Sequence, residues 1–180
     1  MRKIEVLVIE DNSADRFWLE YVLQMFGLDY SFSAATDGED AVNFLLKRGK
    51  YLQAPTPDLI FLDAHLPMLN GIEVLRQVPN ARELPICVLT SSAAERNIFQ
   101  REFGIQDSNY LLKPVTHGSI LESSCCRDHL NLETTLLASM WTSCTPPVPP
   151  ITKHRIAAMV RRYIRGGSLF SENAAAGVGL

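Results

Sequence analysis

Residues 58–71, DLIFLDAHLPMLNG, carry the clearest pattern of secondary structure in the chain. The stretch begins with an almost wholly apolar run, which is typical of a parallel strand that is buried on both faces. The run ends at Asp63, and a loop with Pro67 and Gly71 then leads into helical spacing at 72–78. A strand, a carboxylate, a loop and a helix in this order predict one unit of a layered α/β domain.

The same alternation of strand-like and helix-like segments continues on both sides of this stretch. Four more runs of strand length are IEVLVI at 4–9, YSFSAA at 30–35, PICVL at 85–89 and NYLL at 109–112. Apolar residues recur at helical spacing in the segments 14–26, 38–48 and 92–103. Strands and helices that alternate in this way predict a three-layer α/β domain with a parallel sheet.

The first helical segment has two distinct faces. Its apolar stripe contains Trp18, whereas Asp15, Arg16 and Glu20 fall on the other side. We therefore expect Trp18 to face the core and the three charged side chains to face solvent.

The composition fits an ordinary soluble globular protein. The 180 residues are 47% hydrophobic and 21% charged, with a formal net charge of −3, so neither nucleic acid nor a membrane is expected as the main partner. The run at 4–9 is too short for a signal peptide, and no run approaches the ~20 apolar residues of a membrane span. The four cysteines form no CxxC pair or zinc spacing, and Cys87 is expected to be a buried thiol. We therefore expect a reduced, cytoplasmic protein.

The pattern weakens in the last third of the chain. We expect one more helix over 117–132, capped by Thr116, and a main domain over residues 1–130. Residues 131–180 form a poorly patterned tail with a proline-rich linker at 145–150 and a basic segment at 153–165. The basic segment either docks on nucleic acid, an anionic membrane or the acidic domain, or is a solvated run of charge. A further hypothesis is that the last third is not selected for this fold, for example after a frameshift.

Polar residues stand where the apolar runs end. Glu10 and Asp11 follow the first run, Asp63 ends the third, Thr90 ends the fourth, and Lys113 follows the fifth. Because ligands of open α/β sheets bind outside the carboxyl ends of the strands, we expect these side chains to share one shallow pocket.

This set of residues predicts phosphoryl chemistry. Three close carboxylates repel one another, and a hard divalent cation such as Mg²⁺ relieves that repulsion. Asp63 can then attack a phosphoryl donor as a nucleophile. The metal, Lys113 and Thr90 would hold the transferring oxygens, so that catalysis is mostly positioning and electrostatics.

The motifs resemble the receiver domain of two-component response regulators over roughly positions 3–116. They are VIEDN, DLIFLDAHLPMLNG, LTSS and YLLKP, in this order. The resemblance implies the flavodoxin-like receiver fold, a doubly wound five-stranded parallel sheet with strand order 2-1-3-4-5. The extended loop before the third strand and YLLKPV are similar to the small regulators that partner bacterial phytochromes.

The resemblance also implies a mechanism and partners. A histidine kinase or phosphotransfer protein would supply the phosphoryl group to Asp63. Glu10, Asp11, Asp63 and the backbone carbonyl of His65 would bind Mg²⁺, with Mn²⁺ as an alternative. Thr90 and Tyr110 would form the switch pair. Their movement would reshape the surface of the fourth helix and fifth strand for a downstream protein.

In this interpretation the chain is a stand-alone regulator and not an enzyme, apart from its own phosphoryl transfer and autodephosphorylation. A homodimer through the fourth helix, fifth strand and fifth helix is a further expectation.

Other functions fit the sequence less well. A phosphohydrolase with an aspartyl-phosphate intermediate usually needs a second Asp two positions after the nucleophile, where this chain has His65. A degenerate receiver that only binds would not need the acidic pair, Thr90 and Lys113. A DNA-binding regulator would require the basic tail to be a folded effector. The switch pair has simpler alternatives: Thr90 is then a plain strand-end hydroxyl, and Tyr110 is a fixed half-buried ring. The His65 side chain is expected to be exposed.

Overall fold

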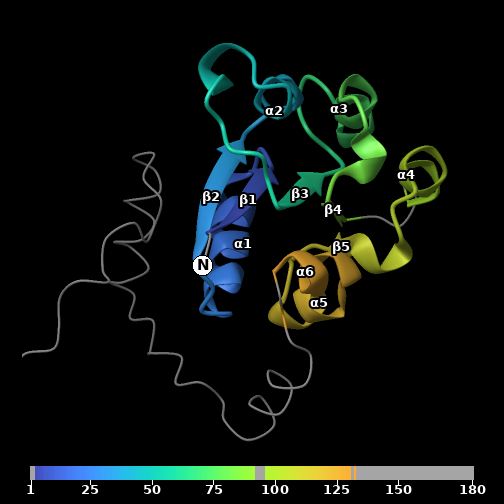
Figure 1. Ribbon diagram of the computed structural model, residues 1–180. Coiled ribbons are helices and arrows are strands. Elements are labelled where there is room, and N and C mark those ends of the chain that lie inside the picture. The colour runs from blue at the N-terminus through green and yellow to red at the C-terminus, as the bar shows by residue number, and fades with distance from the viewer. Residues whose placement is uncertain (1–2, 92–95, 131, 133–180) are drawn as a thin grey trace, which may run out of the picture. The chain divides into compact units, whose positions relative to one another are not determined.

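The computed structural model describes residues 3–91, 96–130 and 132. Five parallel strands form one sheet in the order β2-β1-β3-β4-β5, which confirms the predicted fold (Figure 1). The strands are β1 (Ile4–Ile9), β2 (Tyr30–Ala35), β3 (Leu59–Asp63), β4 (Ile86–Thr90) and β5 (Tyr110–Leu112). The central strands β3 and β4 are buried along their whole length, as their apolar runs predict.

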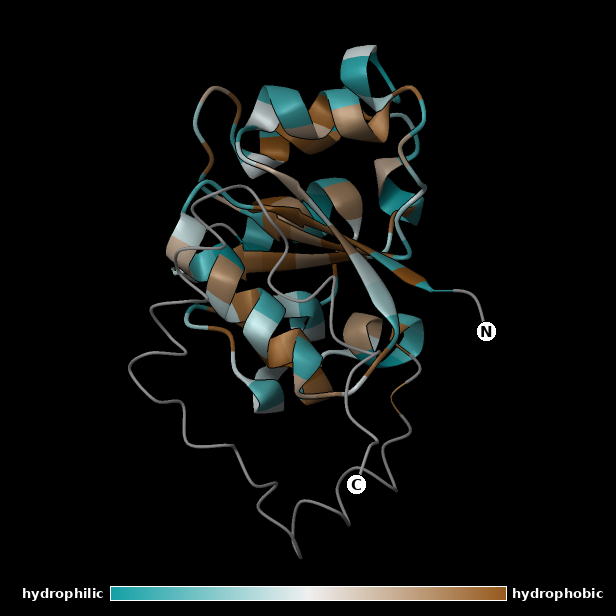
Figure 2. Ribbon diagram, turned by 90° about the vertical axis from the view of Figure 1, so that its left-hand side faces the viewer, coloured by the Kyte–Doolittle hydropathy of each residue, from teal (hydrophilic) through white to brown (hydrophobic). Residues whose placement is uncertain are grey.

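Helices cover both faces of the sheet. They are α1 (Ser13–Gln24), α2 (Gly38–Leu45), α3 (Gly71–Gln77), α4 (Arg96–Phe103), α5 (His117–Glu122) and α6 (Ser124–His129). Between them, in the described residues, lie the short 3-10 turns η1 (Gly49–Tyr51), η2 (Ala81–Glu83) and η4 (Asp107–Asn109). One apolar core joins the sheet to α2, α3 and α4, and a second joins it to α1, α5 and α6. Figure 2 shows the hydrophobic strands between the two helical layers.

Helix α1 differs from the predicted faces at two positions. Glu20 is buried rather than exposed, because α1 lies beside the edge strand, where the Tyr30 hydroxyl donates to the carbonyl of Glu20 at 3.3 Å. Trp18 is 42% exposed, and its indole N–H donates to the carbonyl of Val115 at 2.6 Å. An indole prefers such a position because its ring is apolar and its N–H requires a partner. Cys87, in contrast, is a buried thiol as predicted.

The single helix expected over 117–132 is wrong, because the chain forms two short helices there. Thr116 caps α5 as predicted, since its Oγ1 accepts from the N–H of Ser119 at 3.1 Å. The backbone of Ser123 is extended, and its buried hydroxyl accepts from the N–H of Cys126 at 3.2 Å, which begins α6. A serine hydroxyl that bonds the backbone in this way favours a helix start over a helix interior.

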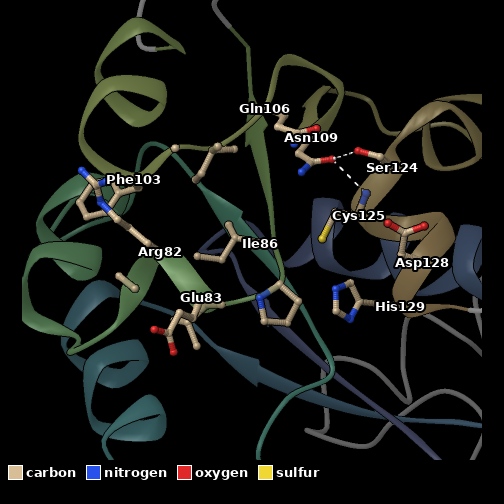
Figure 3. A pocket seen from close by; sticks show the side chains of 15 residues that line it. Arg82, Glu83, Ile86, Phe103, Gln106, Asn109, Ser124, Cys125, Asp128 and His129 are labelled. Carbon is tan, nitrogen blue, oxygen red and sulfur yellow. Dashed lines mark hydrogen bonds between the residues drawn. The ribbon is translucent and has the colours of Figure 1, made fainter.

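A polar side chain from η4 holds the start of α6. The Oδ1 atom of Asn109 accepts from the Ser124 hydroxyl at 3.1 Å and from the N–H of Cys125 at 3.0 Å (Figure 3). These contacts border a cavity of about 290 Å³ between α6, η2 and the α4–β5 connection. Asn109 therefore supplies a second cap for α6 from another element, in addition to the local cap from Ser123.

The linker predicted at 145–150 and the basic segment at 153–165 lie outside the described residues. Within the described ranges, α1 is the longest helix with 12 residues, and no helix there is long and apolar enough to cross a membrane.

Candidate functional site

The carboxyl ends of four strands bring the predicted polar residues together. Asp63 is the last residue of β3 and Thr90 the last of β4, while Glu10 and Lys113 directly follow β1 and β5. The N–H of Lys113 donates to the carbonyl of Thr90 at 3.1 Å, which continues the ladder past the end of β5. Because the strands are parallel, all four side chains project from one edge of the sheet.

Three carboxylates form an oxygen-rich cluster at this edge. Glu10, Asp11 and Asp63 each place one carboxylate oxygen within 4.8 Å of the others, with Glu10 and Asp63 buried and Asp11 exposed. Burial raises the pKa of Glu10 to about 7; the hydrogen bond from Lys113 opposes this rise, and the nearby charge of Asp63 adds to it. Such a set of oxygen donors suits a hard divalent cation, which would relieve the repulsion.

The ammonium group of Lys113 lies among these carboxylates. Its Nζ atom is 2.5 Å from Asp63 Oδ2, 2.6 Å from Glu10 Oε2 and 3.4 Å from Asp15 Oδ2. Burial lowers the pKa of Lys113, but the hydrogen bonds to Asp63 and Glu10 outweigh burial and leave that pKa raised. Lys113 is therefore a fixed positive charge directly beside the predicted nucleophile.

The loop after β3 orients Asp63. The N–H of His65 donates to Asp63 Oδ1 at 3.0 Å, which leaves Oδ2 to face Lys113. The His65 side chain is exposed, as predicted. At Gly71 an added Cβ would stand 2.7 Å from the Asp63 carbonyl oxygen, so the close approach of α3 to β3 requires glycine. The carbonyl of Pro67 accepts from the N–H of Gly38 at 3.2 Å and ties the same loop to α2.

The two predicted switch residues occupy different surroundings. Thr90 is 1% exposed at the site end of β4. The Tyr110 ring is buried under α4, and its hydroxyl donates to the carbonyl of Arg96 at 3.1 Å. The Arg96 guanidinium lies over that ring, 5.4 Å from its centre, and burial raises the pKa of Tyr110 to about 12. The Tyr110 ring is therefore buried, and not half-buried as the simpler alternative expected. Its role as a switch stays a prediction.

Two residues at the site were not singled out from the sequence. Arg16 Nη1 donates to the carbonyls of Glu10 at 2.5 Å and Asp11 at 2.8 Å, and Asp15 contacts Lys113. We expected both on the solvent face of the first helix. Both residues stand in the first helical turn after the acidic pair Glu10-Asp11. Because helical side chains point back toward the helix N-terminus, this position could have predicted that they lie at the site.

Comparisons with known proteins show what the domain as a whole is similar to. The family model of the response regulator receiver domain matches residues 6–124. Response regulator Rcp1 of Synechocystis is 35% identical over 96 residues, which are 52% of this chain and 65% of Rcp1. Other curated relatives are longer, and the chain spans between about a third and a half of their length.

Solved structures of response regulators and receiver domains also superpose on this chain. The bacteriophytochrome response regulator AtBRR superposes with a TM-score of 0.60 at 26% identity, over 73% of this chain and 94% of AtBRR. The Mn²⁺-bound form of Rcp1 gives 0.55 at 28% identity, over 79% and 97% of the two chains. The receiver domain of Ssk1, solved with the histidine phosphotransfer protein Ypd1 of Saccharomyces cerevisiae, gives 0.53 at 28% identity, over 71% and 92%.

Proposed function

Because the chain belongs to the response regulator receiver family of two-component signalling, we propose that it accepts a phosphoryl group on Asp63 in a reaction that depends on Mg²⁺. The observation that carries the proposal is the contact of 2.5 Å between Asp63 Oδ2 and Lys113 Nζ beside the oxygen cluster of Glu10 and Asp11. A nucleophile, a cation and a set of metal-binding oxygens at one edge are the parts that phosphoryl transfer to a carboxylate requires.

In this mechanism the Asp63 carboxylate attacks the phosphorus of the donor. A P–O bond to Asp63 forms while the bond from phosphorus to the donor histidine nitrogen breaks, which gives an acyl phosphate. Lys113 and the Thr90 hydroxyl bind the oxygens of the transferred group. Glu10, Asp11, Asp63 and the backbone carbonyl of His65 would hold Mg²⁺ or Mn²⁺, which when bound neutralises charge on those oxygens.

The partners follow from the same assignment. The likeness to the Ssk1 receiver, which was solved with a phosphotransfer protein, supports a histidine kinase or phosphotransfer protein as donor. Thr90 and Tyr110 would transmit the change to the surface of α4, β5 and α5, where a downstream protein or a second copy of this chain would bind. We assign these roles to a receiver domain over residues 1–130 in the cytoplasm, with 131–180 as a separate tail.

A phosphohydrolase is the weaker alternative. Its second acidic residue would stand at position 65, where this chain has an exposed histidine. Autodephosphorylation by water is therefore the only hydrolysis that we assign to the site.

Intact mass measurement tests the proposal. The purified full-length chain is incubated with Mg²⁺ and acetyl phosphate, and the expected result is a gain of one phosphoryl group. Asp63→Asn should gain none, chelation of Mg²⁺ should prevent the gain, and Asp107→Asn, a change at an exposed carboxylate in η4, should behave as wild type. A folded wild-type protein that gains no phosphoryl group would refute the proposal.

A further inference from the structure

The ammonium group of Lys113 has one partner that the proposed chemistry does not use. Glu10 and Asp63 belong to the proposed metal-binding set, and Asp63 is also the proposed nucleophile. Asp15, 3.4 Å away in the first turn of α1, belongs to neither group. Its side chain is 41% exposed, so it approaches Lys113 from the solvent side, whereas the other two carboxylates are buried.

The ammonium in this arrangement occupies one oxygen of the proposed nucleophile. Lys113 Nζ lies 2.5 Å from Asp63 Oδ2, while the other oxygen of Asp63 accepts from the N–H of His65. Attack on a donor requires the ammonium to leave Oδ2 and to meet the incoming phosphoryl oxygens. Two buried carboxylates hold it inward, and Asp15 is the one carboxylate within 4 Å, among the described residues, that draws it outward.

The surroundings of Lys113 allow only a short movement. A hollow of about 10 Å³ lies beside its side chain, bordered by Glu10, Asp15, Trp18 and Pro114. That volume is close to the least that can hold one water molecule. The hydrogen bond from the Trp18 indole to Val115 fixes one wall of this hollow.

We propose that Asp15 is a positioning residue for phosphoryl transfer: it draws the Lys113 ammonium away from Asp63 Oδ2 and presents it to the phosphoryl group. This inference rests on the proposed function of Asp63. Asp15 acts through Lys113 and touches neither the nucleophile nor the metal in this assignment. Its removal therefore slows the transfer even when Mg²⁺ is saturating.

The test compares Asp15→Asn and Asp15→Glu in two backgrounds, wild type and Lys113→Gln. The rate of phosphorylation by saturating acetyl phosphate and the Mg²⁺ dissociation constant are measured for each folded variant. Asp15→Asn should slow the wild-type reaction about two- to fivefold, the factor that a partly exposed ion pair provides. Asp15→Glu should recover at least half of the loss. In the Lys113→Gln background, Asp15→Asn should have no further effect.

Three results would overturn the inference: an unchanged rate in Asp15→Asn, an equal slowing in both backgrounds, or a weaker Mg²⁺ affinity that accounts for the slowing. If the Lys113→Gln background reacts too slowly to measure, the ¹³C resonance of Lys113 Cε decides. Asp15→Asn should then lower the pKa of Lys113, and an unchanged pKa contradicts the contact. Failure of wild type to gain a phosphoryl group would refute the proposed function, whereas a normal wild-type gain with an unaffected Asp15→Asn refutes only this inference.

Discussion

The site edge and the closing helices α5 and α6 belong to the same domain but are built differently. At the site edge, four strand ends place their polar residues through the register of a parallel sheet, and every strand is held by its neighbours. The closing helices have six residues each and depend on a few side-chain caps, from Thr116 and Ser119 for α5 and from Ser123 and Asn109 for α6. The chemistry that we propose therefore depends on the part of the domain in which each position is supported by several neighbours. Substitutions at the site edge should therefore change both the phosphorylation rate and the stability, whereas substitutions at the closing helices should change the stability alone.

Removal of the Lys113 ammonium group should have the largest effect on stability. In Lys113→Ala, the buried carboxylates of Glu10 and Asp63 lose their common partner, which should cost about 3 kcal/mol of unfolding free energy. Added Mg²⁺ should recover part of the loss, because it supplies positive charge to the same oxygens and binds only the folded chain. Urea unfolding with and without Mg²⁺ measures both effects.

The matched control is Lys50→Ala, since Lys50 pairs with Asp40 on the surface. This variant should unfold at nearly the wild-type urea concentration. A loss in Lys113→Ala no larger than that of the control would contradict the electrostatic account of the site.

Two glycine substitutions compare the regions directly. Gly71→Ala places a methyl group against the backbone of Asp63 and should cost about 2 kcal/mol, with slower phosphorylation because the loop of the nucleophile moves. Gly118→Ala in α5 meets nothing closer than 3.8 Å and should stabilise the protein by about 0.5 kcal/mol, because alanine favours a helix. Thermal unfolding of both variants gives the sign of each change in stability. If both changes have the same sign, the two regions do not differ in this way.

Removal of the cap between the closing helices should have a moderate effect without loss of chemistry. Ser123→Ala loses the acceptor for the N–H of Cys126 and should cost about 1 kcal/mol. The phosphorylation rate should stay within twofold of wild type, because the break lies at the closing helices and not at the strand ends. A reaction slowed more than twofold in the folded Ser123→Ala variant would show that α6 supports the site.

Removal of the tail should have the smallest effect. The proposed site is formed by residues between Glu10 and Lys113, so a chain that ends at Leu137 should be phosphorylated as fast as the full-length protein. Side-by-side time courses of the intact mass measure this. A slower reaction in the shorter chain would assign the tail a role in phosphoryl transfer.

The sequence predicted the sheet and the site edge well, for a physical reason. Buried parallel strands read as continuous apolar runs, so β1 and β2 were predicted with their observed bounds and the other three within one residue. The rule that ligands bind at the carboxyl ends of strands then brought Asp63, Thr90 and Lys113 together without any structure.

Contacts between distant segments explain what the sequence did not predict. The break at Ser123 depends on its burial and on the neighbouring cap from Asn109, which comes from another element. The pairing of Asp15 with Lys113 joins residues 98 positions apart, and no local pattern records it. The prediction that Glu20 is exposed was wrong for the same reason. Helical spacing shows which residues share a face of α1, but it does not show that the neighbouring strand β2 covers part of that face.

The identity of the phosphorylated residue decides whether Asp63 is the phosphoacceptor. After reaction with acetyl phosphate and Mg²⁺, sodium borohydride reduces an acyl phosphate on aspartate to homoserine, and peptide mass mapping then locates the change. We expect homoserine at position 63 and at no other carboxylate. Modification of Glu10 or Asp11 instead, or a phosphoryl group that is present but resists reduction, would contradict it.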